Sequence, residues 1–227
     1  MAKDRSTVFI VDDDRSVRTA LARLMRSRKM LAETFASAEE FLDRDPRDAP
    51  GCIVLDLKMP GVTGLELQED LTAAGISLPI VFLTGHGDVP DSVAAMKGGA
   101  VDFFEKPVDE DELMDAIKQA VEWDIRAREK RAELIEVQER LNDLTPRESQ
   151  VFRGVVQGKL NKQIASGLGM SEKTVKVHRA RVMQKMQADS LAGLVRIAER
   201  IGAPLDAADD SRSEPLPSRH ATPATGA

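Results

Sequence analysis

The sequence predicts an α/β domain built on a five-stranded, doubly wound parallel sheet, joined by a helical linker to an all-α domain of four helices. Between residues 7 and 121, short apolar runs alternate with amphipathic stretches, which is typical of parallel strands with helices on both faces of a sheet. From residue 144 onward helical periodicity continues without a strand-like run. A chain of 227 residues is long enough for two such domains.

The predicted strands are short runs of mainly Val, Ile, Leu and Phe bounded by Gly, Pro or Asp, as expected for strands that are buried on both faces. They lie near residues 7–11, 30–35, 52–56, 79–83 and 101–104. Amphipathic segments separate them, at residues 17–25, 65–74 and 92–97. The expected α/β domain therefore spans residues 7–121.

The linker is expected at residues 122–143. No Gly or Pro occurs between Pro107 and Pro146, so the last helix of the first domain can continue into it. Apolar residues follow a heptad spacing over barely two heptads: Ala127, Leu134 and Leu141, with Val137 and Leu144. This spacing leaves two interpretations open, a coiled coil between two chains or an amphipathic helix packed on its own domain.

Capping residues divide the second domain, residues 144–202, into four helices. Thr145-Pro146-Arg147-Glu148 has the pattern of a capping box with Pro in the first turn. The N-cap candidates of the next three helices are Asn161, Ser171 and Ser190, and Gly169 is expected to supply the turn between the second and third helices. Residues 203–227 are rich in Asp, Ser, Pro, Ala and Thr, which predicts a disordered tail.

Charge is distributed unevenly along the chain. Residues 1–121 carry 14 Lys and Arg against 23 Asp and Glu, a net charge of -9, whereas residues 144–202 carry 11 against 4, a net charge of +7. An acidic and a basic half indicate two different partners. The single Cys52 has no partner for a disulfide or a zinc site. Because no apolar run approaches the ~18 residues of a membrane span and no signal-peptide pattern opens the chain, a cytoplasmic protein is expected.

Four of the predicted strands end at or next to residues that can accept or bind a phosphoryl group. Asp12 and Asp13 follow the first strand, Asp56 ends the third, Thr84 follows the fourth, and Lys106 lies just beyond the fifth. Ligands of open parallel sheets bind at the carboxyl ends of the strands, so these side chains are expected to meet at one edge.

The negative charge of the three carboxylates at that edge indicates that a cation binds there. Two like charges ~4 Å apart repel by roughly 4 kcal/mol at an effective dielectric constant near 20, and one Lys cannot neutralise three carboxylates. Oxygen donors without His or Cys favour a hard ion, Mg²⁺, with the backbone carbonyl of Lys58 as a further ligand. Thr84 and Lys106 suit an oxyanion that arrives later, as a hydrogen-bond donor and a mobile charge.

The third helix of the second domain has two distinct faces. Its predicted core face carries Val175, Val182 and Met186, flanked by His178 and Met183. The opposite face carries Lys173, Val177, Ala180, Arg181 and Gln184, with Thr174 and Lys176 at its edges. Basic residues around small ones suit a DNA major groove. A solvated basic face is the alternative, but the preceding capped helix and Gly turn complete a helix-turn-helix over about residues 161–180.

The motifs of the first half are VDDD at 11–14, DLKMPG at 56–61, LTG at 83–85 and EKP at 105–107. With them the segment resembles the CheY-like receiver domain of two-component response regulators. The resemblance implies that Asp56 accepts a phosphoryl group from a sensor histidine kinase, that Asp12 and Asp13 hold Mg²⁺, and that Thr84 and Lys106 contact the phosphoryl oxygens. It also places Phe103 at an aromatic switch, with a strand aromatic in the core as the other interpretation.

The second half, from LTPRE to VHRARVMQKM, resembles the LuxR-type DNA-binding domain. The whole chain is thus similar to response regulators of the FixJ/NarL class, and nearest to the FixJ branch through TGHGDVP and VHRARVMQKM. The resemblance implies DNA contacts by Lys173, Thr174, Lys176 and Val177, to which the helix face adds Arg181. Arg179 replaces an apolar residue of many LuxR-type domains and is expected to pack its stem and reach a phosphate.

These features predict a phosphorylation-activated transcriptional regulator that dimerises and binds promoter DNA, with RNA polymerase as a further partner. Val93 and Lys97 are the candidates for the dimer face. A phosphorylation-independent DNA-binding regulator is one alternative. A Mg²⁺-dependent phosphohydrolase is another, but its aspartyl intermediate would need a second Asp two residues after Asp56, where the chain has Lys58. The chain is therefore not expected to be an enzyme.

Overall fold

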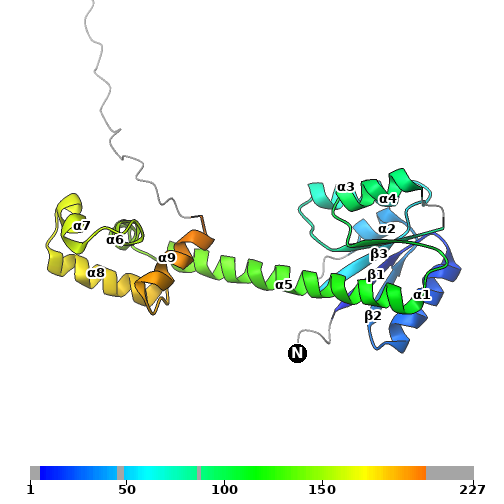
Figure 1. Cartoon of the computed structure of the whole chain (residues 1–227), viewed down its shortest axis with the longest axis horizontal. Coiled ribbons are helices and arrows are strands. Elements are labelled where there is room, and N and C mark those ends of the chain that lie inside the picture. Colours follow the sequence, from blue (N-terminus) through cyan, green and yellow to red (C-terminus); the bar gives the residue numbers. More distant parts are fainter. Residues whose placement is uncertain (1–5, 45–48, 86–87, 203–227) are drawn as a thin grey trace, which may run out of the picture. The chain divides into compact units, whose positions relative to one another are not determined.

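The structure is a computed structural model that describes residues 6–44, 49–85 and 88–202 (Figure 1). Its contacts divide the chain into two compact units, residues 1–132 and 133–227. The predicted tail, residues 203–227, lies outside the described residues. No helix in the described part of the chain is long and apolar enough to cross a membrane.

The first unit contains a five-stranded parallel sheet in the order β2-β1-β3-β4-β5, which confirms the predicted doubly wound fold. The strands are β1 (Thr7–Val11), β2 (Leu31–Phe35), β3 (Gly51–Leu55), β4 (Ile80–Thr84) and β5 (Asp102–Glu105). Their bounds lie within one residue of those predicted. All residues of β1, β3 and β4 are buried, because helices cover both faces of the central strands.

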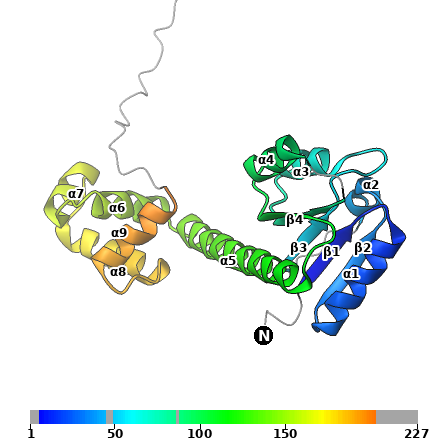
Figure 2. The same ribbon diagram turned by 45° about the vertical axis from the view of Figure 1, so that its right-hand side comes forward.

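Helices cover the sheet in two layers (Figure 2). They are α1 (Arg15–Ser27), α2 (Ala38–Leu42), α3 (Gly64–Ala73), α4 (Val89–Lys97) and α5 (Glu110–Asn142). One apolar core joins the sheet to α2, α3 and α4, through residues such as Phe41, Leu67 and Ala95, and a second joins it to α1 and α5, through Met25 and Ile117. The five-residue α2 was not predicted, because it is too short to show a helical period.

The helix α5 runs without a break through residues 122–142 of the predicted linker and ends one residue before the predicted boundary. Its last part contributes Val137 to the core of the second unit, Leu144 joins that core just after the helix ends, and Leu141 packs against it. Val137, Leu141 and Leu144 thus pack within the second unit. Leu134 is half-buried and Ala127 is exposed.

Among its described residues, the second unit consists of the end of α5 and four helices: α6 (Pro146–Val156), α7 (Asn161–Leu168), α8 (Glu172–Lys185) and α9 (Leu191–Arg200). The predicted capping box is present, since Thr145 N donates to Glu148 Oε2 at 3.0 Å and Glu148 N donates to Thr145 Oγ1 at 3.3 Å. Gly169 ends α7 in the left-handed region, with φ +65°. Ser171 and Ser190 cap α8 and α9 as predicted.

The prediction that Asn161 caps α7 is wrong. Leu160 occupies the N-cap position and Asn161 is the first helical residue. The Asn161 side chain is turned to α8 instead, where its Oδ1 accepts a hydrogen bond from Arg179 Nη1 at 3.1 Å. Gln163 takes over part of the capping, because its Oε1 accepts the Leu160 N–H at 2.8 Å.

Candidate functional site

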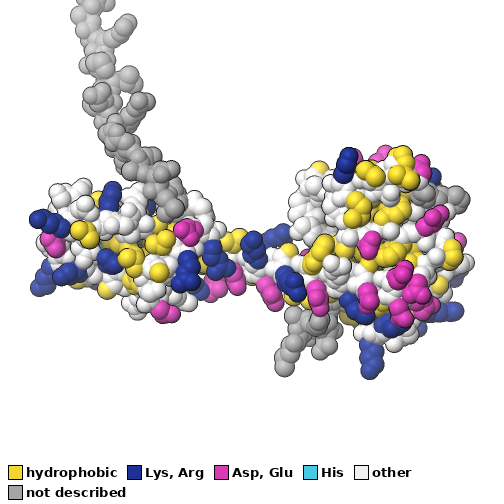
Figure 3. Space-filling model, viewed as in Figure 1, with side chains coloured by type: hydrophobic (Ala, Val, Ile, Leu, Met, Phe, Trp, Pro, Cys, Tyr) yellow, Lys and Arg dark blue, Asp and Glu magenta, His cyan; other side chains and the backbone are white. Residues whose placement is uncertain are grey.

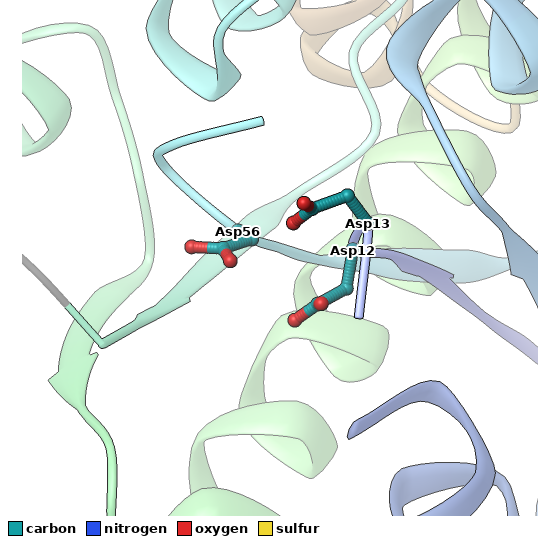
Figure 4. Close-up of side chains that lie close together, drawn as sticks. All are labelled: Asp12, Asp13 and Asp56. Carbon is teal, nitrogen blue, oxygen red and sulfur yellow. The ribbon is translucent and has the colours of Figure 1, made fainter. Parts of the chain in front are cut away.

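Three aspartates gather at the carboxyl ends of two adjacent strands (Figure 4). Asp12 and Asp13 follow β1, Asp56 follows β3, and Asp56 N donates to Val11 O at 2.8 Å, which keeps the two strand ends together. One carboxylate oxygen of each aspartate lies within 4.8 Å of the others. Asp12 and Asp56 are buried, with 2 % and 8 % exposure, whereas Asp13 is exposed. The pocket therefore opens to solvent on the side of Asp13.

Lys106 is the cation bonded to the buried pair. Its Nζ donates to Asp12 Oδ2 at 2.6 Å and to Asp56 Oδ2 at 3.2 Å. Burial lowers the pKa of Lys106, but the hydrogen bonds and charges of the two aspartates outweigh burial and hold that pKa above its ordinary value. Burial raises the pKa of Asp12, against the opposing effect of Lys106.

The charges of the pocket do not balance. Two carboxylates at the 4.8 Å limit repel by about 3.5 kcal/mol at an effective dielectric constant near 20, and one ammonium faces three carboxylates. All the side-chain donors are hard oxygen atoms. The residues present therefore fit a hard divalent cation.

The backbone around Asp12 is fixed by further hydrogen bonds. Asp14 N donates to Asp12 Oδ1 at 2.8 Å, and the Asp14 side chain caps α1 by accepting from Ser16 N at 2.6 Å. Arg18 Nη1 donates to Asp12 O at 2.6 Å. Sequence reasoning missed Arg18, and no signal could have revealed it, because its target is a backbone carbonyl that every residue carries.

The other predicted pocket residues lie at the same edge of the sheet. Lys58 N lies 3.4 Å from Asp56 Oδ1, so the chain turns back over the pocket after β3. Thr84 is fully buried at the end of β4, and its carbonyl accepts the Lys106 N–H at 2.7 Å. The Lys106-Pro107 peptide bond is cis. Phe103 is half-buried with its ring centroid 6.1 Å from that of Phe82, a position that suits both interpretations of this residue.

The candidate dimer residues lie on α4. Val93 is 45 % exposed, Lys97 is exposed, and with Ser92 and Met96 they line an open hollow of about 350 Å³. Figure 3 shows hydrophobic side chains on the surface of this part of the first unit. The structure therefore presents these residues at a surface.

The faces of α8 are as the sequence predicts. Val175, Val182 and Met186 have no exposed surface, and His178 and Met183 are half-buried. The exposed residues are Lys173, Thr174, Lys176, Val177, Ala180, Arg181 and Gln184. None of the three basic residues among them forms an ion pair within the described part of the chain. Lys and Arg side chains appear along the α7 and α8 side of this unit in Figure 3.

Arg179 differs from the other candidate DNA contacts because it is half-buried and bonded to Asn161. That bond ties α7 to α8 within the helix-turn-helix. It uses one of the five N–H groups of the guanidinium. A role in holding the two helices together is thus added to the predicted phosphate contact.

Family comparisons agree with both halves of this description. A family model described as response regulator receiver domain matches residues 8–118. A second, described as bacterial regulatory proteins, luxR family, matches residues 142–198. The first match contains the acidic pocket, and the second contains the helix-turn-helix.

Full-length relatives share both parts. The chain is 44 % identical over 201 residues to Nodulation protein W of Bradyrhizobium diazoefficiens, covering 88 % of each chain. It is 44 % identical over 192 residues to the transcriptional regulatory protein FixJ of Rhizobium meliloti, covering 85 % of this chain and 94 % of FixJ. The structure of response regulator StyR matches with a TM-score of 0.79 at 47 % identity, covering 86 % of this chain and 99 % of StyR. Full-length FixJ of B. japonicum matches with a TM-score of 0.53 at 42 % identity, covering 86 % and 97 %.

Pocket, helix-turn-helix and relatives point to one conclusion. The chain belongs to the FixJ/NarL family of two-component response regulators and is a phosphorylation-dependent transcription regulator, with a receiver domain and a LuxR-type DNA-binding domain.

Proposed function

We propose that Asp56 accepts the phosphoryl group that controls this regulator. An Asp56 carboxylate oxygen bonds to phosphorus as the P–N bond of a phosphohistidine on a sensor histidine kinase breaks, and the leaving imidazole nitrogen takes up a proton. The observation that carries the proposal is the position of Asp56 at a strand end, where its carboxylate lies beside those of Asp12 and Asp13 and accepts a hydrogen bond from Lys106 Nζ.

The proposed metal is Mg²⁺, held by Asp12, Asp13 and Asp56 with the carbonyl of Lys58. When bound, it neutralises carboxylate charge and the charge of the phosphoryl oxygens. Lys106 supplies the remaining positive charge, since its Nζ already lies within hydrogen-bond distance of two of the carboxylates. Its raised pKa keeps this ammonium protonated near neutral pH.

The proposed switch uses Thr84 and Lys106, which would turn to the phosphoryl oxygens, and Phe103, which would move inward as Thr84 moves. Two or three charge-assisted hydrogen bonds at ~1.5–3 kcal/mol each sum to ~3–9 kcal/mol, a range that includes the ~5.5 kcal/mol needed to shift a population from 1:99 to 99:1. Thr84 and Lys106 are already linked through a backbone hydrogen bond, which supports a concerted rearrangement.

The proposed output is a dimer that binds promoter DNA in the cytoplasm and acts together with RNA polymerase. Val93 and Lys97 on α4 form its proposed contact surface. The proposed DNA contacts are Lys173, Thr174, Lys176, Val177, Arg179 and Arg181. A dimer would place two recognition helices on half-sites one helical turn apart.

We do not propose phosphohydrolase activity. An aspartyl-phosphate enzyme needs a nearby general acid to protonate its leaving group, and Lys58 occupies the position two residues after Asp56.

The test compares the native chain with Asp56→Asn and with Asp70→Asn, which changes an exposed acid on α3. After incubation with acetyl phosphate and Mg²⁺, we expect a phosphate-affinity gel to show a shifted band for the native chain and for Asp70→Asn only. Gel shifts and sedimentation of the same samples should show tighter DNA binding and a dimer in those two alone. A phosphorylated Asp56→Asn chain would refute the assignment of the acceptor.

A further inference from the structure

Asp124 is a buried carboxylate in α5, six residues beyond the segment that matches the receiver family. Its side chain is 3 % exposed. Its Oδ2 accepts the Gly51 N–H at 2.9 Å and the Arg128 Nε–H at 2.8 Å. Asp124 lies between Val121, a core residue, and Ile125, which packs against that core. A carboxylate on such an apolar helix face is costly unless it is hydrogen-bonded, so its two donors explain why it is tolerated there.

The Gly51 bond joins α5 to the strand that leads to the acceptor pocket. Gly51 is the first residue of β3, and Asp56 directly follows the last. A Cβ at Gly51 would lie 2.4 Å from Thr7 O, so the start of β3 packs against β1 too closely for a side chain. The Gly51 N–H is hydrogen-bonded to Asp124. The Asp124 carboxylate thus attaches α5 to the first residue of β3, whereas Asp56 follows the last residue of that strand.

Other contacts extend this attachment along the predicted linker. Ile125 packs against the core of the first unit, and Arg131 Nη2 donates to Ser77 Oγ at 2.9 Å. From residue 133 the partners change, because Glu133 pairs with Arg200 and Val137 enters the core of the second unit. Residues 122–132 are therefore attached to the receiver although they lie outside the matched segment.

We propose that Asp124 is a positioning residue for regulation: it holds residues 119–132 of α5 on the receiver, and the state of the acceptor pocket controls DNA binding only while this anchor is intact. A helical segment of this length is marginal in water by itself, so residues beyond the packed core depend on such contacts to remain helical. The part of this proposal that concerns DNA binding rests on the proposed role of Asp56.

The experiment uses the full chain with Asp124→Asn and Asp124→Ala. Asn can still accept the Gly51 N–H through its amide oxygen, whereas Ala removes the oxygen to which Gly51 N and Arg128 Nε donate. Trp123 is the sole Trp of a chain without Tyr, is 47 % exposed and precedes Asp124, so its emission reports on this part of α5. Hydrogen exchange of the amides of residues 121–132 gives a second measure of the anchor.

Two controls separate positioning from general stability. Phe41→Leu weakens the apolar core on the other face of the sheet, far from α5 in the layer arrangement. Asp115→Asn removes an exposed ion pair with Lys118 on the same helix. The regulatory measurement is the ratio of DNA affinities with and without acetyl phosphate, and the rate of phosphorylation is recorded alongside it.

For Asp124→Ala we expect amide exchange in residues 121–132 to become about tenfold faster or more, Trp123 emission to shift to the red, and the affinity ratio to fall about fivefold or more. The phosphorylation rate should stay within about twofold, and Asp124→Asn should be intermediate. If Asp124→Ala does not fold, the same measurements on Asp124→Asn test the proposal. The proposal would be overturned if the affinity ratio of Asp124→Ala were unchanged. It would also be overturned if Phe41→Leu, at a comparable free energy of unfolding, lowered the affinity ratio as much as Asp124→Ala does.

If Asp56 is not the acceptor, the native chain itself will show no phosphorylation-dependent affinity ratio. The exchange and emission measurements do not depend on phosphorylation and still test the anchor. Unchanged exchange in Asp124→Ala would then overturn the anchor itself.

Discussion

Replacing Asp13 with Asn should weaken stabilisation of the first unit by Mg²⁺. Asp13 contributes one of three carboxylate oxygens that lie within 4.8 Å of one another, and an amide is a poorer ligand for a hard cation. At a Mg²⁺ concentration ten times the dissociation constant, binding stabilises the native chain by about 1.4 kcal/mol. For a unit of 132 residues this corresponds to a rise of about 4–5 °C in Tm.

If Asp13→Asn weakens Mg²⁺ binding about tenfold, the same concentration stabilises the unit by only about 0.4 kcal/mol, or about 1 °C. In the absence of Mg²⁺, the variant should be slightly more stable than the native chain, because one repelling charge is gone. The two effects have opposite signs, which a general loss of folding could not produce.

The assay is thermal unfolding followed by the emission of Trp123, which lies in the first unit, with Mg²⁺ or with a chelator. Asp14→Asn is the matched control: it removes the same charge one residue away, while Asn still caps α1. Equal loss of Mg²⁺ stabilisation in Asp13→Asn and Asp14→Asn would show that bulk charge, and not ligation by Asp13, is responsible.

Three further predictions concern stability. The Lys185 hydrogen bond and the Thr145 N–H lower the pKa of buried Glu148 to about 2. The contribution of Glu148 to the free energy of unfolding should therefore be full above its ordinary pKa of 4.5 and lost as the pH falls towards 2. Glu148→Gln should lower the free energy of unfolding by about 2–3 kcal/mol at neutral pH and flatten this pH dependence, measured by circular dichroism during urea unfolding. Burial raises the pKa of Cys52 to about 12, so a thiol reagent should label it only at the rate of unfolding, whereas rapid labelling of the native chain would contradict its burial. Gly64→Ala should destabilise the first unit by more than about 2 kcal/mol, because the new Cβ would lie 2.3 Å from Asp56 O. The control is Gly167→Ala, which has open space around its Cβ and should stabilise the second unit by about 0.5–1 kcal/mol. Urea unfolding measures both changes.

The sequence predicted most of the fold because its signals are local. A buried parallel strand is a short apolar run, and the five runs appear in β1 to β5 within one residue. The capping box at Thr145 and the turn at Gly169 depend on a few adjacent residues, so they were also readable. The cap predicted at Asn161 was wrong because a residue distant in sequence, Arg179, competes for its side chain.

For the site, the sequence by itself determined which residues stand at the strand ends: the carboxylates, the hydroxyl and the ammonium. Strand order follows from pairing between distant segments, so only the tertiary structure decided that Asp12, Asp13 and Asp56 share a pocket and that Lys106 bonds to two of them. Only it revealed that Asp124 is buried against Gly51, 73 residues away. A hydrogen bond between distant segments leaves no periodic trace along the chain, because it depends on how the packed helices and strands meet.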